Sequence, residues 1–181
     1  MASAGILSVT EVNALPNEQF EWIFGNVIEH CPDAAKYVFN HKPFLTCETL
    51  KSAFDNYLDK LDIHEKEVIL LKHPELAGKL LDEGKLTGES KNEQKSAGLD
   101  NLTKEEKFTL SQLNFMYKEK FQFPFVICVR KTKMQTIIAA IENRLKNSRD
   151  VEINLGIEEV KKISRIRISD LIWPDTKSLS S

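Results

Sequence analysis

The sequence is poor in the residues that mark several common classes of protein. Its 181 residues include seven glycines and three cysteines, and the cysteines form no CxxC pair. An odd number of isolated cysteines does not suit a disulfide framework, so we expect a reducing compartment and no secretion. No apolar run approaches the roughly 18 residues of a membrane-spanning helix, and the N-terminus lacks a charged-then-apolar secretory pattern. We therefore expect no association with membranes.

A net positive charge and the common catalytic motifs are also missing. The formal net charge is −2 at pH 7, whereas binding to nucleic acid needs a clear cationic excess, so we expect no nucleic-acid partner. His64-Glu65 is followed by Val68 at the position where a zinc protease has its second histidine. Neither a glycine-rich phosphate loop nor a Gly-x-Ser-x-Gly elbow is present. These motifs give no support for a metal site or a nucleophilic hydrolase.

What the sequence does contain is a succession of helical patterns. A composition of 41% hydrophobic and 29% charged residues is typical of a globular protein. The length suits one domain with a substantial core, and we expect it to cover residues 8–173, between flexible ends at 1–7 and 174–181. Capping signals and 3.6-residue periodicity predict helices that open at Ser8, Pro16, Pro32, Thr46, Asp62, Thr103, Thr132 and Ser148. The Asp62 helix should reach His73, and the last helix should run from Arg149 to about Ile172. The predicted fold class is all-α, a single compact multi-helix domain.

Residues 121–130 (Phe-Gln-Phe-Pro-Phe-Val-Ile-Cys-Val-Arg) break the helical pattern. They are aromatic and β-branched, and Pro124 is incompatible with a helix interior. Alone, the pattern would predict a strand, but no second strand of similar strength is available to pair with it. We interpret the stretch as one extended segment of an all-α fold, whose unmatched backbone groups could bind a polar ring.

Two polar features stand where apolar residues would be expected. His73 ends an apolar helical run because Pro74 disfavours helical angles at the preceding residue. Ser90, Glu93 and Gln94 have the spacing i, i+3 and i+4, which gives them one face of a helix. The two features together suggest a lined pocket.

The last helix carries an arginine inside its apolar stripe. Ile157, Val160 and Ile168 mark this stripe, and Arg167 lies within it, whereas Arg165 lies toward its edge. An inward guanidinium needs an anionic partner, because a lone buried charge is costly. The partner could be Glu93, another carboxylate or a bound anion. We expect a bound anion, with Glu93 as a secondary contact, so that Arg167→Gln would leave stability nearly unchanged.

Each of these features also has a purely structural explanation. A histidine before proline commonly ends a helix, Ser-x-x-Glu-Gln can be a solvated face, and an inward arginine is usually paired within the fold. A segment rich in phenylalanine is more often core than ligand site. None of the features identifies a function by itself.

Taken in order, however, the motifs resemble those of the 2-oxo-4-hydroxy-4-carboxy-5-ureidoimidazoline (OHCU) decarboxylase family, which completes the conversion of urate to allantoin. The resemblance extends from Val12 to about Leu171. The motifs that carry it are Phe24-Gly25-Asn26-Val27, Cys31-Pro32, Lys42-Pro43-Phe44, His73-Pro74-Glu75-Leu76-Ala77-Gly78, Leu86-Thr87-Gly88-Glu89-Ser90, Glu93-Gln94, Phe123-Pro124-Phe125-Val126 and Glu158-Glu159-Val160-Lys161-Lys162-Ile163. The resemblance implies an all-helical homodimer that works without a cofactor on a small anionic substrate.

It also implies roles for individual residues. The catalytic residues would be His73, Glu93 and Arg167. The substrate-binding residues would be Pro74, Ser90, Lys91, Asn92, Glu93, Gln94, Phe125, Val126, Ile127, Cys128 and Val129. No metal ligand is implied. Where the family commonly has a small residue before Leu-Arg, this chain has Arg165-Ile166-Arg167, which adds a charge beside the expected site.

Two further classes of function compete with a decarboxylase. One is a non-catalytic helical interaction module that retains the fold, and the other is a hydrolase of a related ring. His73, Glu93 and Arg167 favour the enzyme, and the missing nucleophile disfavours the hydrolase. Animal relatives often end in a peroxisomal tripeptide, but this chain ends in Ser178-Leu179-Ser180-Ser181. We therefore expect either the peroxisome, by resemblance, or the cytoplasm.

Overall fold

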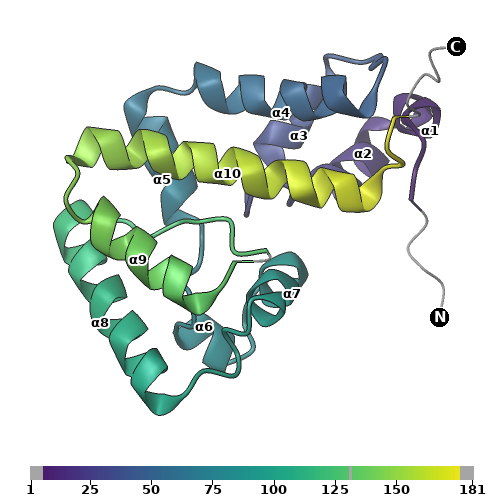
Figure 1. The fold of residues 1–181 in the computed structure, drawn as a ribbon. Coiled ribbons are helices and arrows are strands. Elements are labelled where there is room, and N and C mark those ends of the chain that lie inside the picture. The colour runs from purple at the N-terminus through teal and green to yellow at the C-terminus, as the bar shows by residue number, and fades with distance from the viewer. Residues whose placement is uncertain (1–5, 131, 176–181) are drawn as a thin grey trace, which may run out of the picture. The chain divides into compact units, whose positions relative to one another are not determined.

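The computed structural model describes residues 6–130 and 132–175, and these residues form an all-α fold (Figure 1). Its helices are α1 (Val9–Ala14), α2 (Asn17–Phe24), α3 (Pro32–Phe39), α4 (Cys47–Lys60), α5 (Ile63–Leu71), α6 (Lys79–Asp82), α7 (Gly88–Ser96), α8 (Lys104–Phe121), α9 (Met134–Arg144) and α10 (Arg149–Leu171). Within the described ranges the only β-type pairing is an isolated parallel bridge between Leu7 and Ile172. The predicted fold class is confirmed.

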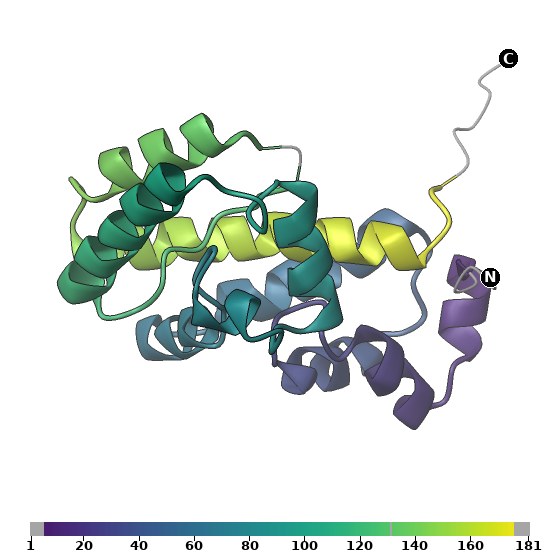
Figure 2. The ribbon, with the colours of Figure 1, turned by 90° about the horizontal axis from the view of Figure 1, so that it is seen from below.

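The helices group into two compact units. Unit 1 comprises residues up to Leu61 together with those from Lys161 onward, and unit 2 comprises Asp62–Val160. Helix α10 contributes to both units as one uninterrupted helix of 23 residues (Figure 2). None of the described helices is both long and apolar enough to cross a membrane.

Unit 1 is built on α2, α3 and α4, which pack on one another. Its core contains Phe20, Phe24 and Phe54, all fully buried, and the rings of Phe20 and Phe24 lie 4.6 Å apart. Two helix starts follow the predicted capping residues: Ser8 and Glu11 form the capping box of α1, and Thr46 caps α4. Local hydrogen bonds of this kind satisfy backbone N–H groups that a helix leaves unpaired.

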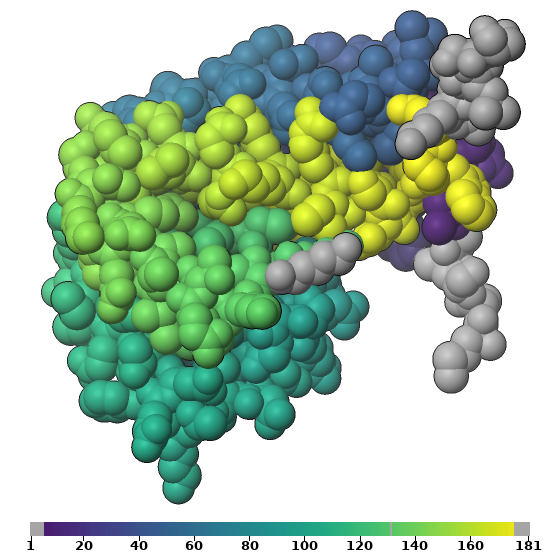
Figure 3. All heavy atoms as spheres, viewed as in Figure 1, coloured from purple at the N-terminus to yellow at the C-terminus, as the bar shows by residue number. Residues whose placement is uncertain are grey.

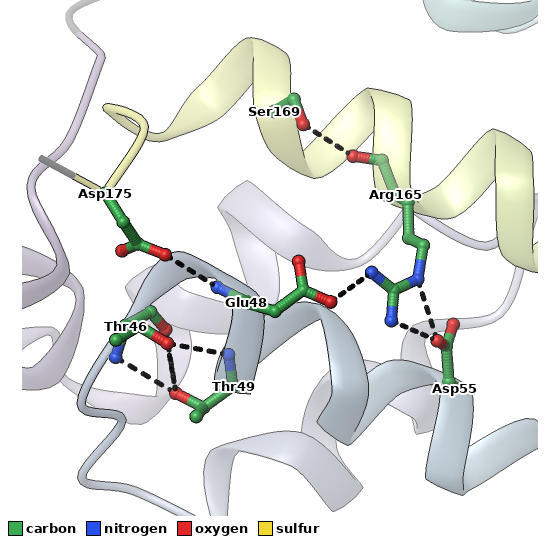
Figure 4. Close-up of polar contacts among 7 residues, drawn as sticks. All are labelled: Thr46, Glu48, Thr49, Asp55, Arg165, Ser169 and Asp175. Atoms are coloured by element: carbon green, nitrogen blue, oxygen red, sulfur yellow. Dashed lines mark hydrogen bonds and ion pairs between the residues drawn. The ribbon is translucent and has the colours of Figure 1, made fainter. Parts of the chain in front are cut away.

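Both described ends of the chain are joined to unit 1. The N–H of Leu7 donates to the oxygen of Leu171, and the N–H of Trp173 donates to the oxygen of Leu7. The carboxylate of Asp175 accepts from the N–H of Cys47 at 2.7 Å, at the start of α4. It also accepts from the N–H of Glu48 at 3.3 Å (Figure 4). A carboxylate is stabilising there because the first N–H groups of a helix carry partial positive charge. The rest of the predicted flexible ends, 1–5 and 176–181, lies outside the described residues.

Unit 2 consists of α5 to α9 and the first half of α10. Tyr117, Phe121, Phe123 and Phe125 form its aromatic core, with the rings of Tyr117 and Phe125 at 5.1 Å. Gly156 lets α10 approach α5, since a Cβ at this position would lie 2.8 Å from a methyl carbon of Leu70. The side of α10 opposite its buried stripe, with Leu155, Glu158 and Lys162, is exposed, and α10 is seen at the surface in Figure 3.

Three boundaries differ from the sequence prediction. Helix α5 ends at Leu71 rather than His73, because Lys72 already forms its C-cap before the His73-Pro74 bond. Helix α9 begins at Met134 rather than at Thr132, whose hydroxyl instead donates to the oxygen of Cys128. Helix α8 ends at Phe121, which was predicted to begin the extended segment 121–130.

Candidate active site

His73 is held at the end of α5 with a defined ring orientation. Its side chain is buried, with 7% exposed, and its Nδ1 lies 2.9 Å from the backbone oxygen of Ile69. A carbonyl oxygen can only accept, so Nδ1 carries a proton. In the neutral ring, Nε2 is therefore the basic nitrogen, and in the imidazolium both nitrogens carry protons. This arrangement suits a group that takes up or delivers a proton at Nε2.

Helix α7 turns a polar face inward, as predicted. Ser90 and Gln94 are 4% and 3% exposed and Glu93 is half-buried, whereas Lys91 and Asn92 are exposed. Helix α7 contains no apolar side chain, and its buried residues are Ser90 and Gln94. The hydroxyl of Thr87 accepts from the N–H of Ser90 and so caps this helix.

Gln94 fixes the loop that follows His73. Its Oε1 accepts from the N–H of Ala77 at 2.9 Å, and its Nε2 donates to the oxygen of Glu75 at 3.3 Å. Ala77 has a φ of +48°, an uncommon conformation for alanine that such a bond helps to maintain. From α8, Asn114 Nδ2 donates to the oxygen of Leu76 at 2.9 Å. The loop is thus tied to two helices, a structural role of Gln94 that the sequence did not reveal.

Residues 122–130, which follow α8, are neither helix nor strand. Phe125, Val126 and Val129 are buried, and Ile127 and Cys128 are half-buried. The expectation that its backbone groups are unmatched by the protein is wrong for several of them. Arg144 Nη1 donates to the oxygen of Val126 at 2.8 Å, and the N–H of Cys128 donates to Glu159 Oε2 at 2.9 Å. Side chains of α9 and α10 thus take the place of a second strand.

A buried charged cluster supports this segment. Glu152 is fully buried and accepts hydrogen bonds from the Tyr117 hydroxyl, from Arg144 Nε at 2.9 Å and from Asn147 Nδ2 at 2.8 Å. Burial raises the pKa of Tyr117, and its hydrogen bond to Glu152 raises it further, so Tyr117 remains a neutral donor. Sequence reasoning missed this cluster, although the helical wheel places Glu152 on the side of α10 that also carries Gly156.

Arg167 points into the interior of unit 1, as predicted. Its side chain is 4% exposed, and Nη1 donates to Glu29 Oε2 at 2.8 Å and to the backbone oxygen of Asn26 at 2.9 Å. Glu29 is 1% exposed. Of the partners left open by the sequence, the structure therefore has another carboxylate, Glu29, which sequence reasoning did not single out.

Arg165 binds α4 (Figure 4). Its Nε donates to Asp55 Oδ2 at 2.8 Å, and its Nη1 contacts Glu48 Oε1 at 2.5 Å. The hydrogen bond to Glu48 raises the pKa of Arg165, the largest effect, and Asp55 adds to it. The extra charge noted in the sequence is thus neutralised by two acidic residues of α4.

The site residues predicted from the sequence are divided between the two units. His73, Pro74, Ser90–Gln94 and Phe125–Val129 belong to unit 2, and Arg167 belongs to unit 1. Within unit 2, Gln94 joins α7 to the loop after His73. The convergence of all these residues on one site stays a prediction.

The described residues offer little to a metal ion. They contain no group of three His, Cys, Asp or Glu side chains arranged to bind one. A cavity of about 480 Å³ borders the His73 loop at Glu75 and Gly78. Four of the six charged residues that line it are paired with one another, Lys107 with Asp82 and Lys118 with Glu75. It contains neither His73 nor the inward face of α7, so it is distinct from the site predicted here.

Comparison with known proteins gives a consistent result. The family model described as OHCU decarboxylase matches residues 13–169. A 2-oxo-4-hydroxy-4-carboxy-5-ureidoimidazoline decarboxylase from Xenopus laevis is 42% identical over 165 residues, which cover 91% of this chain and 94% of the relative. The protein of that name from Amia calva is 40% identical over 166 residues, 92% of this chain and 95% of the relative. Among solved structures, that of an (S)-allantoin synthase matches with a TM-score of 0.74 and 22% identity over 92% of this chain and 54% of that chain. At this identity the structural match shows the fold alone.

Proposed function

Because the chain belongs to the OHCU decarboxylase family, we propose that it converts 2-oxo-4-hydroxy-4-carboxy-5-ureidoimidazoline to (S)-allantoin and CO2 in the degradation of urate. The observation that carries this proposal beyond the family relationship is the fixed imidazole of His73. It is buried, its tautomer is set by Ile69, and its loop is bound by Gln94 from a helix with a polar inward face.

The substrate itself supplies the electron sink for this reaction. Its carboxylate is attached to a carbon next to a ring C=N bond, so the electron pair released with CO2 can move into that imine. A proton must then reach one face of the resulting intermediate. The protein has to orient the substrate, favour departure of CO2 and deliver that proton stereospecifically.

We assign the proton transfer to Nε2 of His73. General acid–base catalysis needs a group that changes protonation near neutral pH, and histidine is suited to this. Glu93, half-buried on α7, would polarise the hydroxyl on the reacting carbon or set the protonation of His73. Pro74 would contact the substrate beside the imidazole.

The remaining binding groups would recognise the ring, the ureido group and the carboxylate. In the stretch from Ser90 to Gln94, we assign the contacts to the inward side chains, since Lys91 and Asn92 are exposed. The backbone of Phe125–Val129 would bind amide-like edges of the substrate. Arg167 would hold the carboxylate or a developing oxyanion with its planar fork of donors, and Glu29 would keep that fork oriented.

The test is circular dichroism of freshly generated substrate in the presence of the purified protein. We expect rapid formation of one allantoin enantiomer together with CO2, at a rate proportional to protein concentration. His73→Asn serves as the matched control, because it removes the titratable nitrogen and keeps a polar side chain. Racemic allantoin formed at the uncatalysed rate would refute the proposal and favour a non-catalytic interaction module.

We further propose a homodimer. The family resemblance supports this, as do three exposed apolar side chains on α8: Phe108 at 66%, Phe115 at 64% and Met116 at 53%. Light scattering coupled to size exclusion should give twice the 20.7 kDa chain mass, and a monomer at all concentrations would contradict it. For the cellular location we propose the peroxisome or the cytoplasm, which imaging of the full chain against a peroxisomal marker would distinguish.

A further inference from the structure

We propose that Glu159 is a positioning residue for the decarboxylation: by binding the N–H of Cys128, it turns the backbone N–H and C=O of Ile127 toward the substrate. This inference rests on the proposed function, in which residues 125–129 bind substrate. Glu158-Glu159 belongs to a motif that carried the family resemblance, yet no role has been assigned to it.

Two side chains form hydrogen bonds with one edge of the extended segment 125–129. The segment runs beside α10 (Figure 1), and Glu159 Oε2 lies 2.9 Å from the nitrogen of Cys128. Arg144 Nη1 lies 2.8 Å from the oxygen of Val126. In an extended chain, the N–H and C=O of one residue point to the same edge, and successive residues alternate between edges. Residues 126 and 128 therefore direct their bound groups to the α9 and α10 side, and Ile127 directs its N–H and C=O to the opposite side.

Both side chains that bind the segment are themselves held in place. Arg144 is bound by Glu152 and Tyr117, and its guanidinium carbon lies 4.5 Å from the ring centre of Phe125. Glu159 is half-buried and lies on α10, a helix of 23 residues. In addition to the hydrogen bonds from Arg144 and to Glu159, the oxygen of Cys128 accepts from the hydroxyl of Thr132 at 3.2 Å. The register of the segment is thus fixed by side chains from outside it.

This register has a chemical consequence. One peptide residue presents a donor and an acceptor side by side, which is the pattern needed to bind a cyclic amide or ureide edge. A rotation of the Cys128 peptide would turn the C=O of Ile127 away from the substrate side. By accepting the Cys128 hydrogen bond, Glu159 opposes this rotation and would act on substrate binding without touching the substrate.

The test compares two substitutions of Glu159, one that changes the charge of the side chain and one that changes its length. Glu159→Gln loses the charge but keeps an oxygen at the same distance, so the Cys128 hydrogen bond can form. Glu159→Asp keeps the charge but is one methylene too short to reach it. We expect KM for OHCU to rise about tenfold or more in Glu159→Asp, with kcat much less affected, and to stay within about threefold of wild type in Glu159→Gln. The control variants Glu158→Asp and Glu158→Gln change the exposed neighbouring residue. Both should have the wild-type KM for OHCU.

Amide hydrogen exchange supplies a readout that does not need activity. Exchange at the Cys128 amide should accelerate in Glu159→Asp and remain slow in Glu159→Gln and both Glu158 variants. The opposite kinetic order, with Asp better than Gln, would show a charge effect and overturn the inference. Equal KM values and equal exchange in all variants would also overturn it. An inactive wild type would instead refute the proposed function.

Discussion

Replacement of Arg167 by glutamine should lower the free energy of unfolding by roughly 3–5 kcal/mol, the usual cost of breaking one side of a buried ion pair. Arg167 and Glu29 are 4% and 1% exposed and their charged atoms lie 2.8 Å apart, so solvent screens neither of them. In Arg167→Gln the Glu29 carboxylate would stay buried and lose the guanidinium 2.8 Å from it, while His30 Nε2 remains 3.8 Å from its other oxygen. At about 2–4 °C per kcal/mol for a chain of this length, the melting temperature should fall by about 6–20 °C.

Two further variants show whether the pair itself is responsible. Glu29→Gln should cost a similar amount, and the double variant should cost clearly less than the sum of the two, with a coupling above about 1 kcal/mol. Arg165→Gln is the matched control on the same helix. Its side chain is 34% exposed and its partners Glu48 and Asp55 are 59% and 17% exposed. Because solvent screens these ion pairs more than the Arg167–Glu29 pair, Arg165→Gln should cost clearly less stability.

The measurement is urea unfolding and thermal melting followed by circular dichroism at 222 nm. Activity is assayed in parallel, well below the lowest melting temperature, because the proposed contact of Arg167 with substrate predicts a separate loss of catalysis. An unchanged melting temperature in Arg167→Gln would refute the conclusion that the buried Arg167–Glu29 pair stabilises the fold. It would favour the expectation from the sequence that the partner of Arg167 is a bound anion. Strict additivity of the two single variants would also refute it.

Three other predictions address different parts of unit 2 and α4. His73→Ala should lower kcat/KM about 10²–10⁴-fold while the helical circular dichroism spectrum persists, since it removes the proton-transfer group and leaves the helices in place; retention of half the wild-type rate would exclude His73 as the proton-transfer group. Burial, and then Glu152, raise the pKa of Tyr117 above its ordinary value, so the unfolded chain loses this proton first and stability falls as pH rises above about 10. Tyr117→Phe should flatten that fall in urea melts at successive pH values, and an unchanged slope would contradict the assignment. Burial also raises the pKa of the Cys47 thiol, whereas Cys128 is half-buried; mass spectrometry after limited alkylation at about pH 8 should show Cys128 modified well before Cys47, and equal rates would contradict it.

Most helix starts and inward faces could be predicted from the sequence, because they depend on residues within one or two turns of each other. The capping box of Ser8 with Glu11 and that of Thr103 with Glu106 form as predicted. Periodicity placed Arg167 inside the apolar stripe of its helix, and spacing placed Ser90 and Gln94 on one face without deciding between a pocket and solvent; all three are buried. The motif order was sufficient to indicate the family.

The partners of these residues were decided only by the tertiary structure. Glu29 and Arg167 are separated by 138 positions, and no local pattern distinguishes Glu29 from the other carboxylates that could have neutralised the arginine. The extended segment had no strand to pair with, and the sequence could not reveal that Arg144 and Glu159 would bind its backbone instead. Periodicity reports which face of a helix is buried, because burial repeats every 3.6 residues. Which group lies opposite that face depends on how distant helices pack, and this packing is a property of the whole folded chain.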